Sequence, residues 1–144
     1  MNLSLRISLL CLTAPLVSCG TGGGAPSGAQ QFDRTEINQL SEDRFTISVL
    51  AENVDGYELS RCVAAAYAES LRDDEGNRLY SFVERQGGQL TDTFRLKDGV
   101  RTQTTEGLQT FRLTNEGEHD GRDVMAVDLQ LAECEQAGLA ADVE

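Results

Sequence analysis

Tryptophan is absent from this chain of 144 residues, histidine occurs once, at His119, and basic residues are scarce. The 12 lysines and arginines face 24 acidic residues, which gives a net charge of −12. A protein that binds nucleic acid by neutralising phosphates needs a basic surface, so this class is excluded. Long apolar runs are missing as well. None approaches the roughly 20 residues of a spanning helix, which excludes a polytopic membrane protein.

The motifs of common catalytic sites are also missing. No serine occupies a Gly-x-Ser-x-Gly segment, no Cys-x-x-Cys pair is present, and no glycine loop stands between a strand and a helix to hold phosphate. The single histidine lies in a polar stretch between Glu116 and Asp123. We therefore predict that the protein is not an enzyme and needs no cofactor.

The beginning of the chain has the layout of a secretory signal. Met1 to Arg6 carries one positive charge and no acid, Ile7 to Val17 is mostly apolar, and the small residues Ser18 and Cys19 follow. The apolar segment is shorter than the roughly 20 residues that a permanent membrane anchor needs. We expect residues 1–18 to be a signal peptide.

The segment Leu16-Val17-Ser18-Cys19 resembles the lipobox of bacterial lipoproteins. In that family a diacylglyceryl group is attached to the cysteine sulfur, the chain is cleaved just before the cysteine, and the new amine is usually acylated, for example with palmitate. The resemblance implies that Cys19 is the lipid attachment site and the first mature residue. Gly20 after it implies an outer-membrane location facing the periplasm. The alternative is an ordinary signal peptide with a chance cysteine near its end.

Three segments follow from this organisation. Residues 1–18 are the signal peptide, and residues 19–30 are the lipidated cysteine with a glycine-rich tether that cannot bury a core. Residues 31–144 are enough for one domain. An acidic domain is repelled by anionic headgroups, so we expect it to meet the membrane only through acyl chains on Cys19.

The first half of the domain predicts one strand and one helix. Arg44 to Ala51 alternates apolar and polar residues, which is typical of a half-buried strand. Asp55 and Glu58 form a capping box before an apolar stripe at helical spacing, within an alanine-rich segment. We expect Asp73 to Gly76 to close this helix, with Gly76 as the left-handed cap.

The second half predicts strands at Leu79 to Val83 and at Gly107 to Thr114, where Phe111 and Leu113 share a face. Gln86 to Gln89 contains two glycines and is expected to break the first of these strands. Thr91 to Thr105 is polar and threonine-rich. It is either a weak ribbon, with Asp98-Gly99 as its hairpin turn, or a loop.

The end of the chain supports two interpretations. Val124 to Leu131 can alternate as a strand, or Asp128 can cap a short helix that runs to Ala137 and ends at Gly138, with Leu139 packing back. We favour the helix. The expected fold class is then α+β: a small antiparallel sheet covered by one long alanine-rich helix and a short C-terminal helix.

This order of elements is similar to that of a group of small, uncharacterised envelope lipoproteins of proteobacteria. The matching segments are Arg44 to Val49, Cys62 to Ala66, Gly76 to Val83, and Cys134 to Leu139. The resemblance implies a location and a fold, and it implies no particular activity.

The four cysteines divide into two kinds. Cys11 lies in the signal and Cys19 is the lipid site, which leaves Cys62 and Cys134. In an oxidising compartment this pair predicts a disulfide, and two buried free thiols are the alternative. Too few histidines and cysteines then remain for a zinc site, so none is predicted.

The function that the sequence favours is a lipid-anchored envelope lipoprotein with a structural or protein-interaction role and an envelope protein as partner. The alternative is a binder of a small molecule or a divalent cation at the acidic turn around Asp120. Spaced acids followed by glycine are similar to the start of a calcium loop. However, Val127 stands where the closing glutamate belongs, so a solvated turn is favoured.

Overall fold

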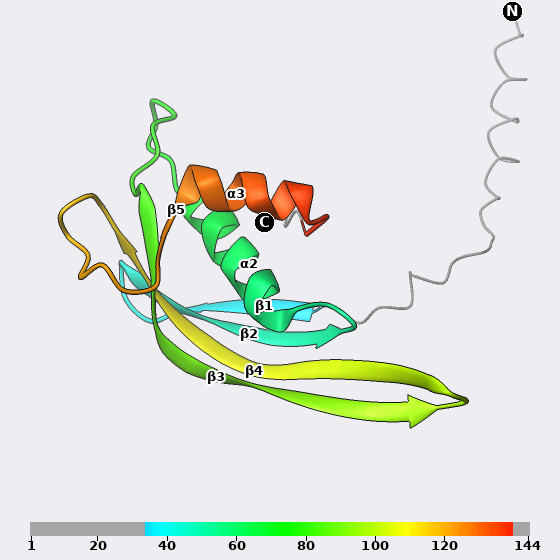
Figure 1. The fold of residues 1–144 in the computed structure, drawn as a ribbon. Helices are drawn as coiled ribbons and strands as arrows, with labels where there is room; N and C mark the ends of the chain where they lie inside the picture. The colour runs from blue at the N-terminus through cyan, green and yellow to red at the C-terminus, as the bar shows by residue number, and fades with distance from the viewer. Residues whose placement is uncertain (1–33, 140–144) are drawn as a thin grey trace, which may run out of the picture. The chain divides into compact units, whose positions relative to one another are not determined.

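The structure is a computed structural model that describes residues 34–139. Five strands form one antiparallel sheet in the order β1-β2-β4-β3-β5, and two helices accompany it. The elements are β1 (Arg34–Gln39), β2 (Arg44–Glu52), α2 (Gly56–Ser70), β3 (Phe82–Lys97), β4 (Val100–Thr114), β5 (Val124–Ala126) and α3 (Val127–Gln136). Figure 1 shows α2 on one face of the sheet and α3 beside α2. The predicted α+β class is confirmed.

The core lies between α2 and the sheet. In β2 the alternate residues Phe45, Ile47, Val49 and Ala51 are buried, as the pattern predicted. The Phe45 ring is 5.7 Å from the ring of Phe111 on β4, measured between centroids. The other buried members of this core are Leu59, Val63, Ala64, Ala68, Val83, Leu113, Met125 and Val127.

The predicted N-cap of α2 at Asp55 is confirmed, and the predicted end of the helix is not. The Asp55 carboxylate accepts hydrogen bonds from the backbone N–H groups of Tyr57 and Glu58, so it is the N-cap. The helix ends at Ser70, and the prediction that Gly76 caps it was wrong. Gly76 instead lies in a turn that the Asp73 carboxylate organises by accepting two backbone N–H groups. Aspartate side chains compete with helical hydrogen bonding in this way.

The strand over Phe82 to Lys97 continues where a break was predicted. A bulge between Arg85 and Gly87 leaves Gln86 without a partner in the register, and Gly87 and Gly88 pair with β4, so β3 bends without ending. Gly107 on β4 has a φ of 153°, and a Cβ there would lie 2.1 Å from the carbonyl oxygen of Gln89. Glycine therefore permits a close approach of the two strands at the bend.

Beyond the bend β3 and β4 stay paired up to their turn, so Thr91 to Thr105 is a ribbon and not a loop. At its base β2 still pairs with β4, and from Phe94 to Gln103 no third strand of the described residues accompanies the ribbon. Asp98 and Gly99 have φ angles of 51° and 79° and form its turn, as predicted. We call residues 89–104 the arm. The pairing of β2 with β4 stops at Thr104, and Figure 1 shows the arm reaching past the end of β2.

The two interpretations of the chain end each hold in part, because a strand of three residues, β5, leads directly into α3. The prediction that Asp128 caps the helix was wrong. The N-cap is Ala126, and the Asp128 carboxylate lies 2.8 Å from the Arg78 guanidinium. Gly138 ends α3 with a φ of 73°, and the N–H of Leu139 donates to the carbonyl of Cys134, as a glycine-capped helix requires.

Candidate functional site

A cleft of about 540 Å³ lies between the arm and the start of α2. The start of α2 lies very close to β4. A Cβ atom on Gly56 would lie only 2.3 Å from the Cγ2 atom of Thr105. This close contact places the first turn of α2 beside the arm and forms one wall of the cleft. The lining residues are Asn53, Val54, Asp55, Gly56, Tyr57, Asp92, Phe94, Arg101, Gln103 and Thr105.

Hydrogen bonds hold the walls of the cleft in place. Thr105 is 1% exposed, and its hydroxyl donates to the Asp92 carboxylate over 2.6 Å. The side chains of Thr105 and Gln103 lower the pKa of Asp92 below its ordinary value of 3.8, because they hydrogen-bond to the charged form. Asn53 joins the α2 wall to the arm, since its backbone N–H and side-chain oxygen both bond to the Gln103 backbone.

The Phe94 ring and the Arg101 guanidinium group line the cleft. The Arg101 guanidinium carbon lies 4.2 Å from the centroid of the Phe94 ring. Tyr57 at the start of α2 is 46% exposed and lines the same cleft. Tyrosine and arginine are enriched among the residues that dominate binding energy in protein interfaces. This part of the surface therefore has the chemistry of a partner-binding site.

The arm exposes three bulky apolar side chains close together in the chain, whereas Leu40, Leu79 and Leu129 are exposed singly on other segments. Phe94 is 50%, Leu96 75% and Val100 64% exposed. Among them stand Arg95, Lys97 and Arg101, three bases in a strongly acidic protein. Phe94 and Leu96 lie on the same face of the arm, which makes this face a candidate interaction surface.

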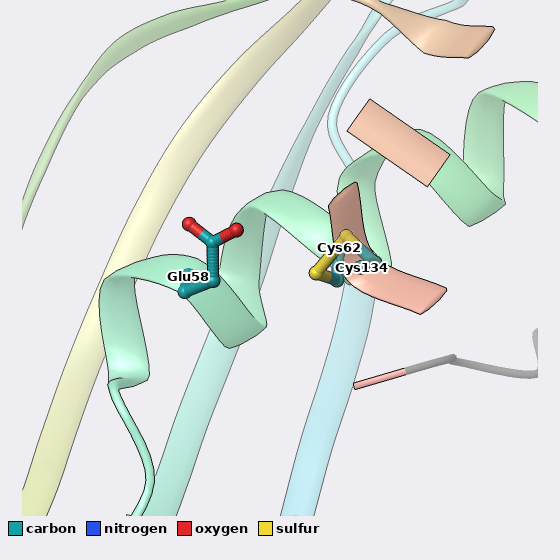
Figure 2. A group of neighbouring side chains, drawn as sticks. All are labelled: Glu58, Cys62 and Cys134. Carbon is teal, nitrogen blue, oxygen red and sulfur yellow. A yellow bond between two sulfur atoms is a disulfide. The ribbon is translucent and has the colours of Figure 1, made fainter. Parts of the chain in front are cut away.

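The structure joins the predicted pair Cys62 and Cys134 in a disulfide, with Cα atoms 5.8 Å apart. Figure 2 shows Cys62 on α2 and Cys134 on α3, so the bond ties one helix to the other. Glu58 lies close enough to form a three-residue group of metal-ligand types with them. Sulfur atoms bonded to each other are not thiolates, and thiolate is the form that binds metal. We interpret this group as a structural connection between the helices.

The acidic turn around Asp120 covers a buried carboxylate. Glu84 is 1% exposed, and it pairs with the Arg112 guanidinium at 2.8 Å. The backbone N–H of Asp120 donates to Glu84, and the Asp120 carboxylate accepts the N–H of Arg122. The carboxylates of Glu84 and Asp120 therefore already accept hydrogen bonds from donor groups of the described residues.

Sequence reasoning did not single out the arm residues. The signal that was available is the alternation of Leu90, Phe94 and Leu96 with polar residues in the threonine-rich stretch. Their exposure depends on where β2 and α2 end, which the pattern does not show. The proposed lipid site Cys19 lies outside the described residues.

No family model, curated protein or solved structure matches this chain. Within residues 34–139, neither helix has the length and apolar character needed to cross a membrane.

Proposed function

We propose that this chain is a lipid-anchored lipoprotein of the bacterial cell envelope, held at the outer membrane facing the periplasm, and that it is a protein-interaction module without catalytic activity. The anchoring rests on the lipobox-like segment that ends at Cys19. The interaction role rests on the arm, where Leu96 remains 75% exposed at the end of a projecting ribbon. An exposed apolar group in this position is best explained by a partner that covers it.

In this proposal the body of the domain is a rigid support for the arm. In this proposal the alanine-rich helix α2 is the long helix that covers the sheet, and the full burial of Ala64, Ala65 and Ala68, which permits close packing, supports this role. Gly56 and Thr105 fix the base of the arm against that helix. Anchoring through acyl chains requires no protein surface to contact lipid, so the arm remains free for a protein partner.

Metabolic labelling tests the anchor. Cells that express the full chain are grown with labelled palmitate, and we expect the label on the wild-type protein and none on Cys19→Ser. Cys11→Ser is the matched control and should keep the label, because that cysteine lies in the proposed signal. A wild-type protein without label would contradict the lipid anchor.

Photo-crosslinking tests the interaction surface. A photoreactive amino acid is placed at position 96 on the arm or at position 129 on α3, where Leu129 is 69% exposed. We expect a protein adduct from position 96 and none from position 129 in intact membranes. Equal yields from both positions, or no adduct from position 96, would contradict the proposed role of the arm.

The alternative function is binding of a small molecule or divalent cation, with the Asp120 turn as the candidate site. The carboxylates of Glu84 and Asp120 already accept protein donors, which supports the interaction role over cation binding. A thermal unfolding scan in the presence of calcium separates the two functions. We expect no change in the midpoint, and a midpoint that rises with calcium concentration would favour the alternative.

A further inference from the structure

One edge of the arm is open. On the side of β3 away from β4, the strand β5 pairs only with Phe82 to Glu84. From Gln89 to Lys97 no strand within the described residues pairs with this side. The backbone N–H and C=O groups on such an edge are a template for one more strand.

The side chains along this edge alternate between two faces. Leu90, Asp92, Phe94 and Leu96 share the face that carries α2, since Asp92 pairs with Thr105, which lies against the start of that helix. The other face carries the residues between them, which are Thr91, Thr93, Arg95 and Lys97. A strand that joins the edge would therefore cover the exposed apolar side chains of the first face.

From the edge and its side-chain pattern, we infer that two copies of this chain pair antiparallel through the open edge of β3, with a two-fold axis at Thr93. This inference deepens the proposed interaction role by naming the partner, and it rests on that role. In this register Leu90 stands opposite Leu96 of the second copy, and Thr91 stands opposite its Arg95. Directly opposed side chains are about 5 Å apart, so the two leucines are in contact.

Neighbouring registers are less favourable. An axis at Asp92 places two carboxylates directly opposite each other, and an axis at Arg95 does the same with two guanidinium groups. An axis at Phe94 places Leu96 opposite Asp92. Like charges directly opposed across strands destabilise the pairing, and an apolar side chain opposite a carboxylate gains little. The axis at Phe94 opposes the two Phe94 rings but gives no leucine pair. The axis at Thr93 opposes Asp92 and Phe94 as well, but it forms two Leu90–Leu96 pairs and opposes no like charges.

Charge also favours a second copy of this chain. The axis at Thr93 places Asp92 opposite Phe94 of the second copy, and Arg101 lies over that ring at 4.2 Å within its own chain. In the described residues neither Asp92 nor Arg101 takes part in an ion pair. In this register the Asp92 carboxylate of each copy therefore lies near the Arg101 guanidinium group of the other copy. This contact occurs twice, once on each side of the axis.

The arm is also where two acidic molecules repel each other least. It carries Arg95, Lys97 and Arg101 against two acids, Asp92 and Asp98, whereas the whole chain has 24 acids and 12 bases. Contact through the arm keeps the acidic remainder of each molecule at a distance.

Cysteine crosslinking of the full chain in its own membranes tests the register. With Thr93→Cys we expect a disulfide dimer on a non-reducing gel after mild oxidation, because this position meets itself on the axis. Thr91→Cys alone should stay monomeric, since its counterpart is displaced by four residues, about 13 Å along the strand. The double variant Thr91→Cys with Arg95→Cys should crosslink again. The wild-type chain reports any background from its own cysteines.

A second comparison tests the apolar contact. In the Thr93→Cys background, Leu96→Asp should reduce the crosslinked fraction at least several-fold, and Leu129→Asp on α3 should leave it unchanged. Circular dichroism confirms that each variant is folded.

Three results would overturn the inference: no Thr93→Cys dimer, equal dimers from Thr91→Cys alone, or a Thr93→Cys bond to a different protein. If the arm contacted lipid and not a second copy, Thr93→Cys would form no dimer. An adduct at position 96 with another protein, without a Thr93→Cys dimer, would overturn this inference and leave the proposed function in place.

Discussion

Glu84 is buried on the face of the sheet that no described helix covers. Its carboxylate accepts hydrogen bonds from Arg112 at 2.8 Å and from Gln86 at 2.9 Å, and the backbone of Asp120 lies above it. A buried carboxylate is tolerated only when its acceptor positions are filled in this way. Glu84 therefore connects the Asp120 turn to β3 and β4.

We predict that Glu84→Ala lowers the free energy of unfolding by about 3 kcal/mol, because it leaves a half-buried guanidinium group without its partner. Urea denaturation measures the loss. Glu106→Ala is the control, since Glu106 is exposed on the same face of β4, and it should change stability by no more than about 0.5 kcal/mol. Equal losses of unfolding free energy in both variants would show that the Glu84–Arg112 pair contributes no more to stability than an exposed glutamate does.

Asp73 gives a prediction about pH. Backbone N–H groups of Asn77 and Glu75, together with the Asn77 side chain, lower the pKa of Asp73 below its ordinary value of 3.8. A carboxyl group with a lowered pKa in the folded state contributes stability above its unfolded pKa, and this contribution is lost as pH falls through the folded pKa. The stability difference between wild type and Asp73→Asn should therefore be constant above about pH 5 and shrink below about pH 4. Urea midpoints measured across this range test it, and a difference that grows towards acid would contradict the prediction.

At the scale of elements, α3 has few connections of its own. Its N-cap Ala126 provides no side-chain hydrogen bond, and its first-turn Asp128 is an exposed partner of Arg78. Its buried side chains are Val127, Gln130 and Cys134, and the last of these bonds to Cys62 on α2. The position of α3 on α2 therefore depends strongly on the disulfide.

We predict that Cys62→Ala with Cys134→Ala lowers the free energy of unfolding by about 4 kcal/mol, since the bond closes a loop with a sequence separation of 72 residues. Denaturation of the double variant beside the wild type measures the loss, and the double change avoids a stray thiol. Alkylation of the folded wild type without reductant is the companion test. If both thiols are labelled, the disulfide is absent and the prediction fails.

At the scale of the whole molecule, stability and interaction belong to different regions. The core lies between α2 and the central strands, and the arm extends past it with its apolar side chains exposed. Exposed side chains contribute little to the folded state, because folding removes little of their surface from water. Changes in the arm should therefore affect partner binding without unfolding the domain.

We predict that Leu96→Ala changes the free energy of unfolding by no more than about 0.5 kcal/mol, because this side chain is largely exposed. Ile47→Ala is the matched comparison in the core, where the side chain is 0% exposed, and it should cost about 3 kcal/mol. Thermal or urea unfolding of both variants distinguishes the regions. A large loss from Leu96→Ala would show that the arm is part of the core.

The features that the sequence by itself determined are local ones. The alternation of β2, the Asp55 cap, the Asp98-Gly99 turn and the exit of α3 at Gly138 each depend on a few neighbouring residues and their backbone preferences. The acidic composition and the single histidine likewise limit the classes of function, because they depend on residue types and not on how the chain folds.

Tertiary structure alone decided the features that depend on distant partners. The edge strand β1 is polar and exists because β2 offers it backbone hydrogen bonds. The glycines after Arg85 do not end β3, since Gly87 and Gly88 pair with Thr110 and Gln109 of β4. The outer part of the arm is exposed because β2 and α2 stop short of it, and no local pattern carries that information. Pairing and burial join residues far apart in the chain, whereas propensity and turn chemistry act between neighbours.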